Sequence, residues 1–252
     1  MNFAHRGASA SAPENTLAAF DAAVSAGADA LELDVRMTKD RQIAVIHDEL
    51  VNRTTDGAGA VRGMTLAELR ALDAGHRFGG YRDAGLTIPT LEETLRRYPD
   101  TFVNVEIKGG ESDAAEGVLA DIAGAGARAE SRVLVVSEDG GVIGRFRELS
   151  EGRIATGASQ REVAAFFLAS KLRVAWALDP AYDSLQIPPE YKGLAIATPR
   201  FIAAAHSRSI VVDVWTINEA REMERLLDLG ADGIMTDRPE TLSEILARRA
   251  EA

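Results

Sequence analysis

The residues best suited to acid–base chemistry are two of the four histidines in the chain, His5 and His47. Each stands at the end of a short apolar run, FAHRG and IAVIHD, where we expect a β-strand to end. An imidazole titrates near neutral pH, so two histidines at one site can act as general base and general acid. A single histidine is more often structural, and it is the pair that favours catalysis.

Three carboxylates occupy similar positions. Glu32 and Asp34 lie two residues apart near the end of the predicted strand 28–37, and Glu106 lies near the end of the predicted strand 102–108. Residues two apart share one face of a strand, so both acids of the first pair point the same way. Three carboxylates without cysteine form an oxygen-rich site that suits Mg²⁺ or Ca²⁺. The alternative is a polar strand end held by salt bridges.

Two cations accompany these groups. Arg6 follows His5 directly, and its planar guanidinium suits the oxygens of a phosphate. Lys108 shares a face with Glu106, either to hold an anion near the metal or to form an ion pair with that glutamate. Two bases, three metal-binding carboxylates and two cations together describe metal-assisted cleavage of a phosphodiester.

The elements that position these residues alternate along the chain, strand then helix, eight times. This alternation predicts a parallel sheet, and eight units in this length predict a (β/α)₈ TIM barrel, with catalytic groups at the C-terminal ends of the strands. An open doubly wound sheet is the competing fold, but no G-x-G-x-x-G motif follows the first strand. The predicted strands are residues 3–7, 28–37, 102–108, 132–138, 153–158, 183–188, 210–217 and 233–237.

Several segments do not fit the simple alternation. Residues 43–48 follow the second strand after only five residues, too few for a parallel crossover, so they are expected to fold back as a hairpin. Residues 49–89 carry turn signals around one short helix and are interpreted as a small inserted region within a single domain spanning 1–252. Residues 11–27 predict the first helix and residues 111–127 a later one.

Composition limits the classes of function. The chain has 252 residues, 28 Lys and Arg against 39 Asp and Glu, a net charge of -11 and no cysteine. Such a chain repels nucleic acid and anionic membranes, and it lacks thiolates for metal binding or catalysis. No run approaches the roughly 18 apolar residues that a bilayer requires, and no secretory signal is visible. We expect a cytoplasmic protein without nucleic-acid partners or stable membrane association, either monomeric or homo-oligomeric.

Seven short motifs follow one another along nearly the whole chain: HRG (5–7), PENT (13–16), ELDV (32–35), IHD (46–48), VEIK (105–108), VWTIN (214–218) and GIMTDRP (233–239), with LQIP (185–188) as a weaker element. Singly each is weak. Together and in this order they resemble the motifs of the bacterial-type glycerophosphodiester phosphodiesterase family.

This resemblance implies a single-domain barrel that hydrolyses glycerophosphodiesters, such as glycerophosphocholine or glycerophosphoethanolamine, to an alcohol and glycerol 3-phosphate. It implies one divalent cation, Mg²⁺ or Ca²⁺, and a proton-transfer pair. The residues that match the family motifs are His5 and His47 as acid and base, Glu32, Asp34 and Glu106 as metal ligands, and Arg6 and Lys108 beside the phosphate.

Three further residues each have two possible roles. By the resemblance Trp215 lines the glycerol side of the pocket, although a tryptophan packed at a barrel rim fits the sequence equally. Glu14 and Asn15 are expected to support the HRG turn. Simple helix capping is the other interpretation, in which Ser11 and Glu14 form a capping box or Asn15 is the N-cap.

Two other functions remain open at this point. A related phosphodiesterase of lysophospholipase D type would use the same chemistry under a different pocket. A barrel kept only as a binding module would be expected to lack one of the histidines or metal ligands, and none is missing.

Overall fold

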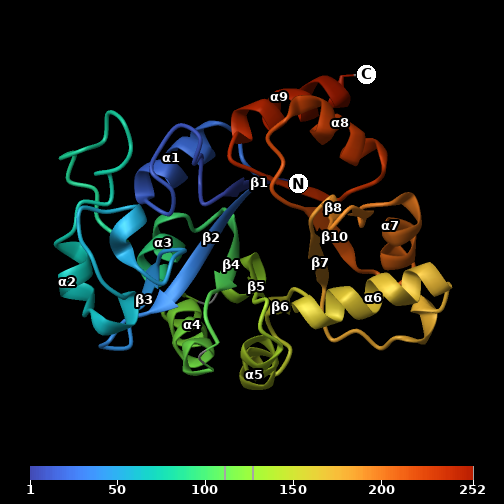
Figure 1. Cartoon of the computed structure of the whole chain (residues 1–252), viewed down its shortest axis with the longest axis horizontal. Helices are drawn as coiled ribbons and strands as arrows, with labels where there is room; N and C mark the ends of the chain where they lie inside the picture. Colours follow the sequence, from blue (N-terminus) through green and yellow to red (C-terminus); the bar gives the residue numbers. More distant parts are fainter. Residues whose placement is uncertain (111, 127, 252) are drawn as a thin grey trace.

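The computed structural model describes residues 1–110, 112–126 and 128–251. Eight parallel strands form a nearly closed barrel, which confirms the predicted fold (Figure 1). Their order around the barrel is β6, β5, β4, β2, β1, β11, β10 and β7, and a parallel bridge between Gly157 and Ser184 joins the two ends. The strands are β1 (Asn2–His5), β2 (Ala30–Met37), β4 (Phe102–Ile107), β5 (Val133–Val136), β6 (Ala155–Thr156), β7 (Ser184–Ile187), β10 (Val211–Val214) and β11 (Gly233–Thr236).

Helices surround this sheet (Figure 1). They pack against the apolar side chains that the strands turn outward, such as Leu31 and Leu33 of β2. The predicted helix 111–127 is observed as α4, and residues 111 and 127 lie outside the described part of the chain. The helices of the barrel are α1 (Leu17–Ser25), α3 (Leu91–Arg97), α4 (Asp113–Gly124), α5 (Gly140–Ser150), α6 (Gln160–Leu172), α7 (Pro199–His206), α8 (Ala220–Asp228) and α9 (Pro239–Ala250).

The first helix begins later than the sequence suggests. Its N-cap is Thr16, whose side chain accepts a hydrogen bond from the amide of Ala19, so neither Ser11 nor Asn15 caps it. Asn15 has a left-handed backbone, φ 57°, which asparagine tolerates but which an N-cap does not use. Gly7 also has a positive φ, and a Cβ there would lie 2.7 Å from the backbone of Ala19. The segment between β1 and α1 is therefore a tight loop held against the helix.

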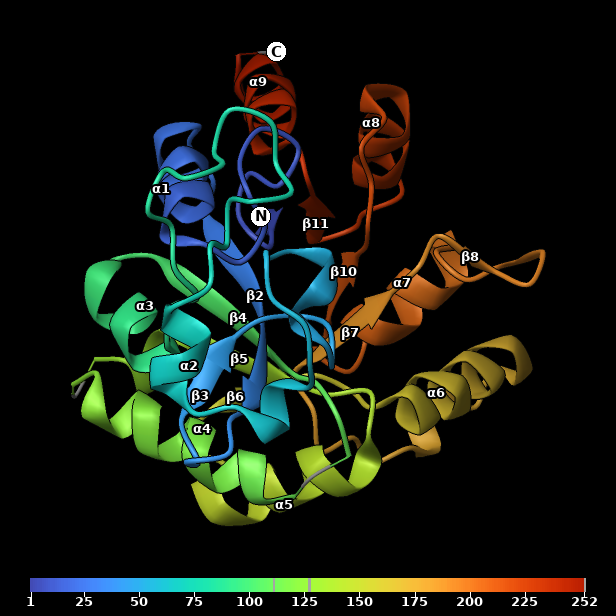
Figure 2. The ribbon, with the colours of Figure 1, turned by 60° about the vertical axis from the view of Figure 1, so that its left-hand side comes forward.

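The region between β2 and α3 (Figure 2) begins with the expected hairpin. Strand β3 (Ile43–Val45) pairs antiparallel with the end of β2. Beyond it lie two short 3₁₀ helices, η1 (Val51–Arg53) and η2 (Val61–Gly63), and the short helix α2 (Leu66–Arg70). This region has its own small apolar cluster, which packs around β3 and includes Val51, Val61, Leu69 and Ile88.

A second excursion separates β7 from α7. It is a two-stranded hairpin of β8 (Glu190–Tyr191) and β9 (Leu194–Ala195), which lies beside α7 in Figure 2. A further short 3₁₀ helix, η4 (Ala175–Ala177), follows α6, and η3 (Glu130–Arg132) precedes β5. No helix within the described residues is long and apolar enough to cross a bilayer.

Candidate active site

The structure brings the three predicted carboxylates together. β1, β2 and β4 are neighbours in the sheet, with His5 opposite Glu32 and Asp34 opposite Glu106. One carboxylate oxygen from each of Glu32, Asp34 and Glu106 lies within 4.8 Å of the others. Glu32 and Asp34 are buried, and the intervening Leu33 points to the opposite side, into the core beneath the helices.

This acidic cluster carries more negative charge than its surroundings neutralise. Burial, and then the charge of Asp34, raise the pKa of Glu32 well above its ordinary value. Burial raises the pKa of Glu106 as well, although the Lys108 ammonium opposes the shift. Three oxygen ligands within reach of one another, buried and mutually repelling, fit a hard divalent cation such as Mg²⁺ or Ca²⁺.

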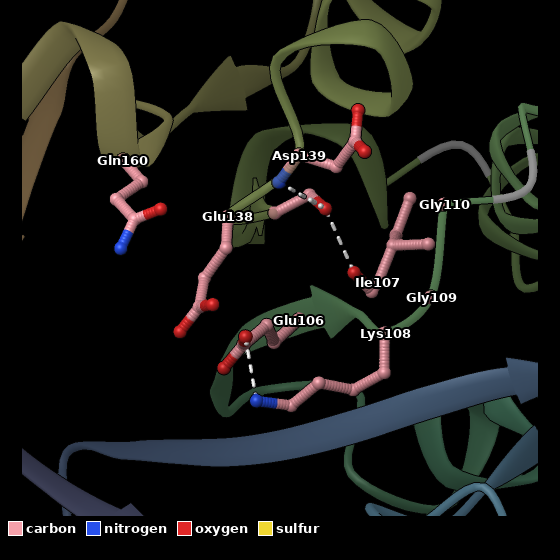
Figure 3. A pocket seen from close by; sticks show the side chains of 9 residues that line it. Glu106, Ile107, Lys108, Gly109, Gly110, Glu138, Asp139 and Gln160 are labelled. Carbon is pink, nitrogen blue, oxygen red and sulfur yellow. Dashed lines mark hydrogen bonds and ion pairs between the residues drawn. The ribbon is translucent and has the colours of Figure 1, made fainter.

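The two predicted cations lie against the cluster. Lys108 Nζ is 2.6 Å from Glu106 Oε1 and 3.4 Å from Asp34 Oδ1, and Figure 3 shows the first of these ion pairs. Arg6 Nε is 3.1 Å from Asp34 Oδ2, and its Nη1 is 2.9 Å from Glu14 Oε1. Both cations therefore border the cluster, and Lys108 does pair with Glu106.

His5 is supported from the last strand of the barrel. Its Nδ1 lies 2.7 Å from Asp237 Oδ1, just beyond β11, and Asp237 also accepts hydrogen bonds from Ser9 Oγ and Asn218 Nδ2. Burial alone would lower the pKa of His5, but the bond to Asp237 and the charge of Glu32 raise it. Conversely, although burial opposes the shift, the bond to His5 lowers the pKa of Asp237 to about 2.

His47 has the same kind of support from a different source. Its Nδ1 lies 2.6 Å from Oδ1 of the next residue, Asp48, and its backbone carbonyl accepts a 2.7 Å hydrogen bond from Arg36 Nε. The hydrogen bonds from Arg53 hold the pKa of Asp48 well below its ordinary value, and His47 adds to the effect. A carboxylate on Nδ1 fixes the ring and leaves Nε2 available for proton transfer.

Glu14 and Asn15 form hydrogen bonds with residues of the candidate site, and neither caps α1. Asn15 Nδ2 donates to Asp34 Oδ2 at 2.9 Å, and Asn15 Oδ1 accepts from the Asp34 backbone amide at 3.2 Å. Asn15 N also donates to the carbonyl of Arg6. Glu14 accepts hydrogen bonds from Arg6 and Arg53. The PENT segment thereby holds both the HRG turn and the acidic cluster.

A cavity of about 500 Å³ connects these groups. His5, His47, Glu32 and Glu106 line its polar part together with Arg6 and Lys108. Trp215 lines it as well and is 38% exposed, so this tryptophan is not a core residue. The opposite wall is apolar and consists mainly of Val163, Ala164, Phe167, Tyr191, Leu194 and Ile196.

A smaller cavity of about 320 Å³ adjoins the acidic cluster (Figure 3). Glu106 and Lys108 line both cavities, and so do Glu138 and Gln160, which are labelled in Figure 3. Glu138 lies just after β5, and Gln160 is the first residue of α6. The lining of the two cavities therefore includes residues after β5 and at the start of α6, beyond the strands that carry the predicted site residues.

The two carboxylates behind the histidines are functional candidates that motif reasoning did not single out. The sequence could have indicated Asp48, because it follows His47 directly. Asp237 ends the last predicted strand, and the rule that placed Glu32 and Glu106 at strand ends applies to it equally. Arg53, Glu138 and the apolar wall carried no comparable signal.

The fold and the site define a barrel enzyme whose ionisable groups gather at the C-terminal ends of the strands. The chain matches the model of the glycerophosphoryl diester phosphodiesterase family over residues 5–241. It therefore belongs to this family and is a phosphoric diester hydrolase.

Individual relatives agree with the family match. The chain is 34% identical over 250 residues to the glycerophosphodiester phosphodiesterase of Caldanaerobacter subterraneus, with 97% of each chain covered. It is 35% identical over 258 residues to that of Bacillus altitudinis, with 96% of each covered. The crystal structure of the Agrobacterium tumefaciens glycerophosphodiester phosphodiesterase has a TM-score of 0.78 at 26% identity, covering 96% of this chain and 98% of that one.

Proposed function

We propose that the protein hydrolyses glycerophosphodiesters, such as glycerophosphocholine and glycerophosphoethanolamine, to an alcohol and glycerol 3-phosphate with the help of one divalent cation. The observation that supports this most directly is the cavity itself. It is lined by two histidines, each held through Nδ1 by a carboxylate, and by two members of a three-carboxylate cluster.

The acidic cluster is the proposed metal site. Glu32, Asp34 and Glu106 would hold Mg²⁺ or Ca²⁺, and their oxygen-only donor set and net charge fit either ion. A bound cation would supply Lewis-acid stabilisation of charge on the phosphoryl oxygens. Asn15 orients Asp34 through two hydrogen bonds, and Arg6 and Lys108 add positive charge on the phosphate side.

The histidines are the proposed proton carriers. One takes a proton at Nε2 from the attacking hydroxyl as its oxygen bonds to phosphorus. The other protonates the oxygen of the departing alcohol as the second phosphorus–oxygen bond breaks. If the attacking hydroxyl belongs to the substrate glycerol, the product is a cyclic phosphate that water then opens. If it belongs to water, glycerol 3-phosphate forms directly.

The test is product formation. Purified protein is incubated with glycerophosphocholine and Mg²⁺ or Ca²⁺, with and without EDTA, and glycerol 3-phosphate is measured enzymatically. We expect release with the cation and none with EDTA. No product with any divalent cation would overturn the proposed reaction, and equal product with EDTA would overturn only the metal site.

A second candidate substrate class is favoured by one specific observation. The cavity wall opposite the histidines is apolar, and Tyr191 and Leu194 at its edge are 51% and 59% exposed. An acyl chain would bury this surface, as a lysophospholipase D reaction requires. A higher kcat/KM for lysophosphatidylcholine than for glycerophosphocholine would favour this alternative.

We also propose a cytoplasmic, metal-dependent enzyme whose partner is its small-molecule substrate, with no nucleic-acid ligand and no stable membrane association. The net charge of -11 and the lack of cysteine support this setting. Gel filtration with light scattering distinguishes a monomer from a homo-oligomer.

A further inference from the structure

Arg53 lies between two carboxylates, one of which contacts His47 and the other Arg6. It is the last residue of the short helix η1, in the region that follows β3. Its guanidinium donates to two different carboxylates, Asp48 on one side and Glu14 on the other. No motif in the sequence singled it out.

The contacts are short and forked on both sides. Arg53 Nε and Nη2 reach Asp48 Oδ2 and Oδ1 at 2.6 and 3.1 Å. Arg53 Nη1 and Nη2 reach Glu14 Oε2 and Oε1 at 2.6 and 2.8 Å. Only a planar guanidinium can make paired bonds to two carboxylates at once, so a lysine cannot replace this arrangement.

Each carboxylate in turn holds a residue that lines the cavity. Asp48 Oδ1 is 2.6 Å from His47 Nδ1, and Glu14 Oε1 is 2.9 Å from Arg6 Nη1. Arg53 is therefore the central member of a continuous series of charged contacts that joins the His47 imidazole to the Arg6 guanidinium. That guanidinium also contacts Asp34 of the acidic cluster.

The electrostatics agree with this geometry. Burial alone would raise the pKa of Glu14, but the hydrogen bonds from Arg53 and the charge of Arg6 outweigh it and lower the pKa. The Arg53 side chain is 47% exposed, however, and exposed ion pairs contribute little to folding stability. The four short bonds are thus better suited to fixing orientation than to stabilising the fold.

We propose that Arg53 is a positioning residue for catalysis, holding His47 through Asp48 and Arg6 through Glu14 in one fixed relation. This inference rests on the proposed function, because it assigns those two residues to the proton and the phosphate. Arg53 itself touches neither reacting group.

The chain offers a matched control. Arg97 is 50% exposed and also makes a forked pair, to Asp21 at 3.2 and 2.7 Å, but it lies on α3 outside the cavity. Loss of its guanidinium removes a comparable ion pair without touching the site. Arg97→Ala should therefore keep the kcat of the wild-type protein.

The experiment compares steady-state kinetics of the full chain with glycerophosphocholine and a saturating divalent cation. Arg53→Ala should lower kcat by about 10- to 100-fold, the usual cost of removing a residue that orients a catalytic group. Its melting temperature should stay within a few degrees of the wild type. Arg53→Lys should recover only part of the loss, and guanidinium at low concentration should partly restore Arg53→Ala.

A double-mutant cycle adds a readout that a purely structural role would not give. Glu14→Gln and Arg53→Ala break the same series of contacts, so their effects on kcat should be far from additive. Full additivity, or Arg53→Ala and Arg53→Lys both within twofold of the wild-type kcat, would overturn the inference while leaving the proposed function standing. An inactive wild-type protein would overturn the proposed function and the inference with it.

Discussion

The two halves of the site hold their histidines with the same contact but on different supports. His5 and its partner Asp237 stand on β1 and just beyond β11, which are paired strands of the barrel. His47 and Asp48 follow the hairpin strand β3, and Arg53 of η1 donates hydrogen bonds to Asp48. The side chain of His5 is 19% exposed and that of His47 is 30% exposed.

This difference shows two ways to fix an imidazole. Asp237 is held by neutral donors, Ser9 and Asn218, which lie on the loops that follow β1 and β10. Asp48 is held by a cation that itself needs a second carboxylate, Glu14. The first half therefore rests on two paired barrel strands and neutral hydrogen bonds, whereas the second depends on a series of ion pairs. Substitutions should therefore affect the support of His5 and the support of His47 differently.

The largest expected effect comes from removing either imidazole. His5→Ala and His47→Ala should each lower kcat by at least about 100-fold, because each removes one proton-transfer step. Circular dichroism should show an unchanged fold. His206→Ala is the control, since His206 also pairs with a carboxylate, Asp232 at 2.8 Å, but on the exposed face of α7. If either cavity variant kept near-wild-type turnover, the assigned acid–base pair would be wrong.

The carboxylates behind the histidines give the next effect and the sharpest contrast. Asp237→Asn and Asp48→Asn should each lower kcat by about 10- to 100-fold. Asp237→Asn should also lower the melting temperature by several degrees, because Asp237 joins Ser9 and Asn218 as well as His5. Asp48→Asn should change it less. Equal thermal losses, measured by differential scanning calorimetry, would contradict the contrast between the two halves.

A smaller effect is expected beneath the site. Asn15→Ala removes both hydrogen bonds that orient Asp34, so the divalent cation concentration giving half-maximal activity should rise by about 10-fold. At saturating cation, kcat should recover most of its wild-type value. A loss of kcat without any change in the cation requirement would place Asn15 outside the metal site.

One buried carboxylate inside the barrel, away from the histidines, should change how folding stability depends on pH without changing activity. Asp213 of β10 is buried and accepts a hydrogen bond from Ser184, and burial raises its pKa to about 6. Since the folded protein binds this proton more tightly than the unfolded chain, Asp213 favours folding at low pH. That contribution is lost as the pH rises from about 4 through about 6. Asp213→Asn should therefore raise the melting temperature at pH 8 but hardly at pH 4, with kcat unchanged. A larger gain at pH 4 would contradict the sign.

Much of the fold and of the acidic cluster could be predicted because both depend on local patterns. Strand and helix periods mark the eight units, and alternation along a strand puts Glu32 and Asp34 on one face. The position of a strand in a parallel barrel then brings Glu106 beside them. Each step needs only the spacing of residues within one element and the order of the elements.

What could not be predicted depends on contacts between distant parts of irregular segments. For His5 and Asp237, 232 positions apart, the predicted barrel brings the two strand ends together, but the hydrogen bond also depends on Ser9 and Asn218 in the loops, which hold the Asp237 carboxylate. Arg53 reaches Glu14 through a loop whose path has no periodic signal. The start of α1 was misplaced because Asn15, a good N-cap by type, bonds to Asp34 instead.

The most direct test of the central claim is a crystal structure of the protein with glycerol 3-phosphate and a divalent cation bound. We expect the cation on Glu32, Asp34 and Glu106, with the phosphate above it between His5 and His47 and in contact with Arg6 or Lys108. A phosphate in the smaller cavity beside Glu138, or one that meets only a single histidine, would contradict it.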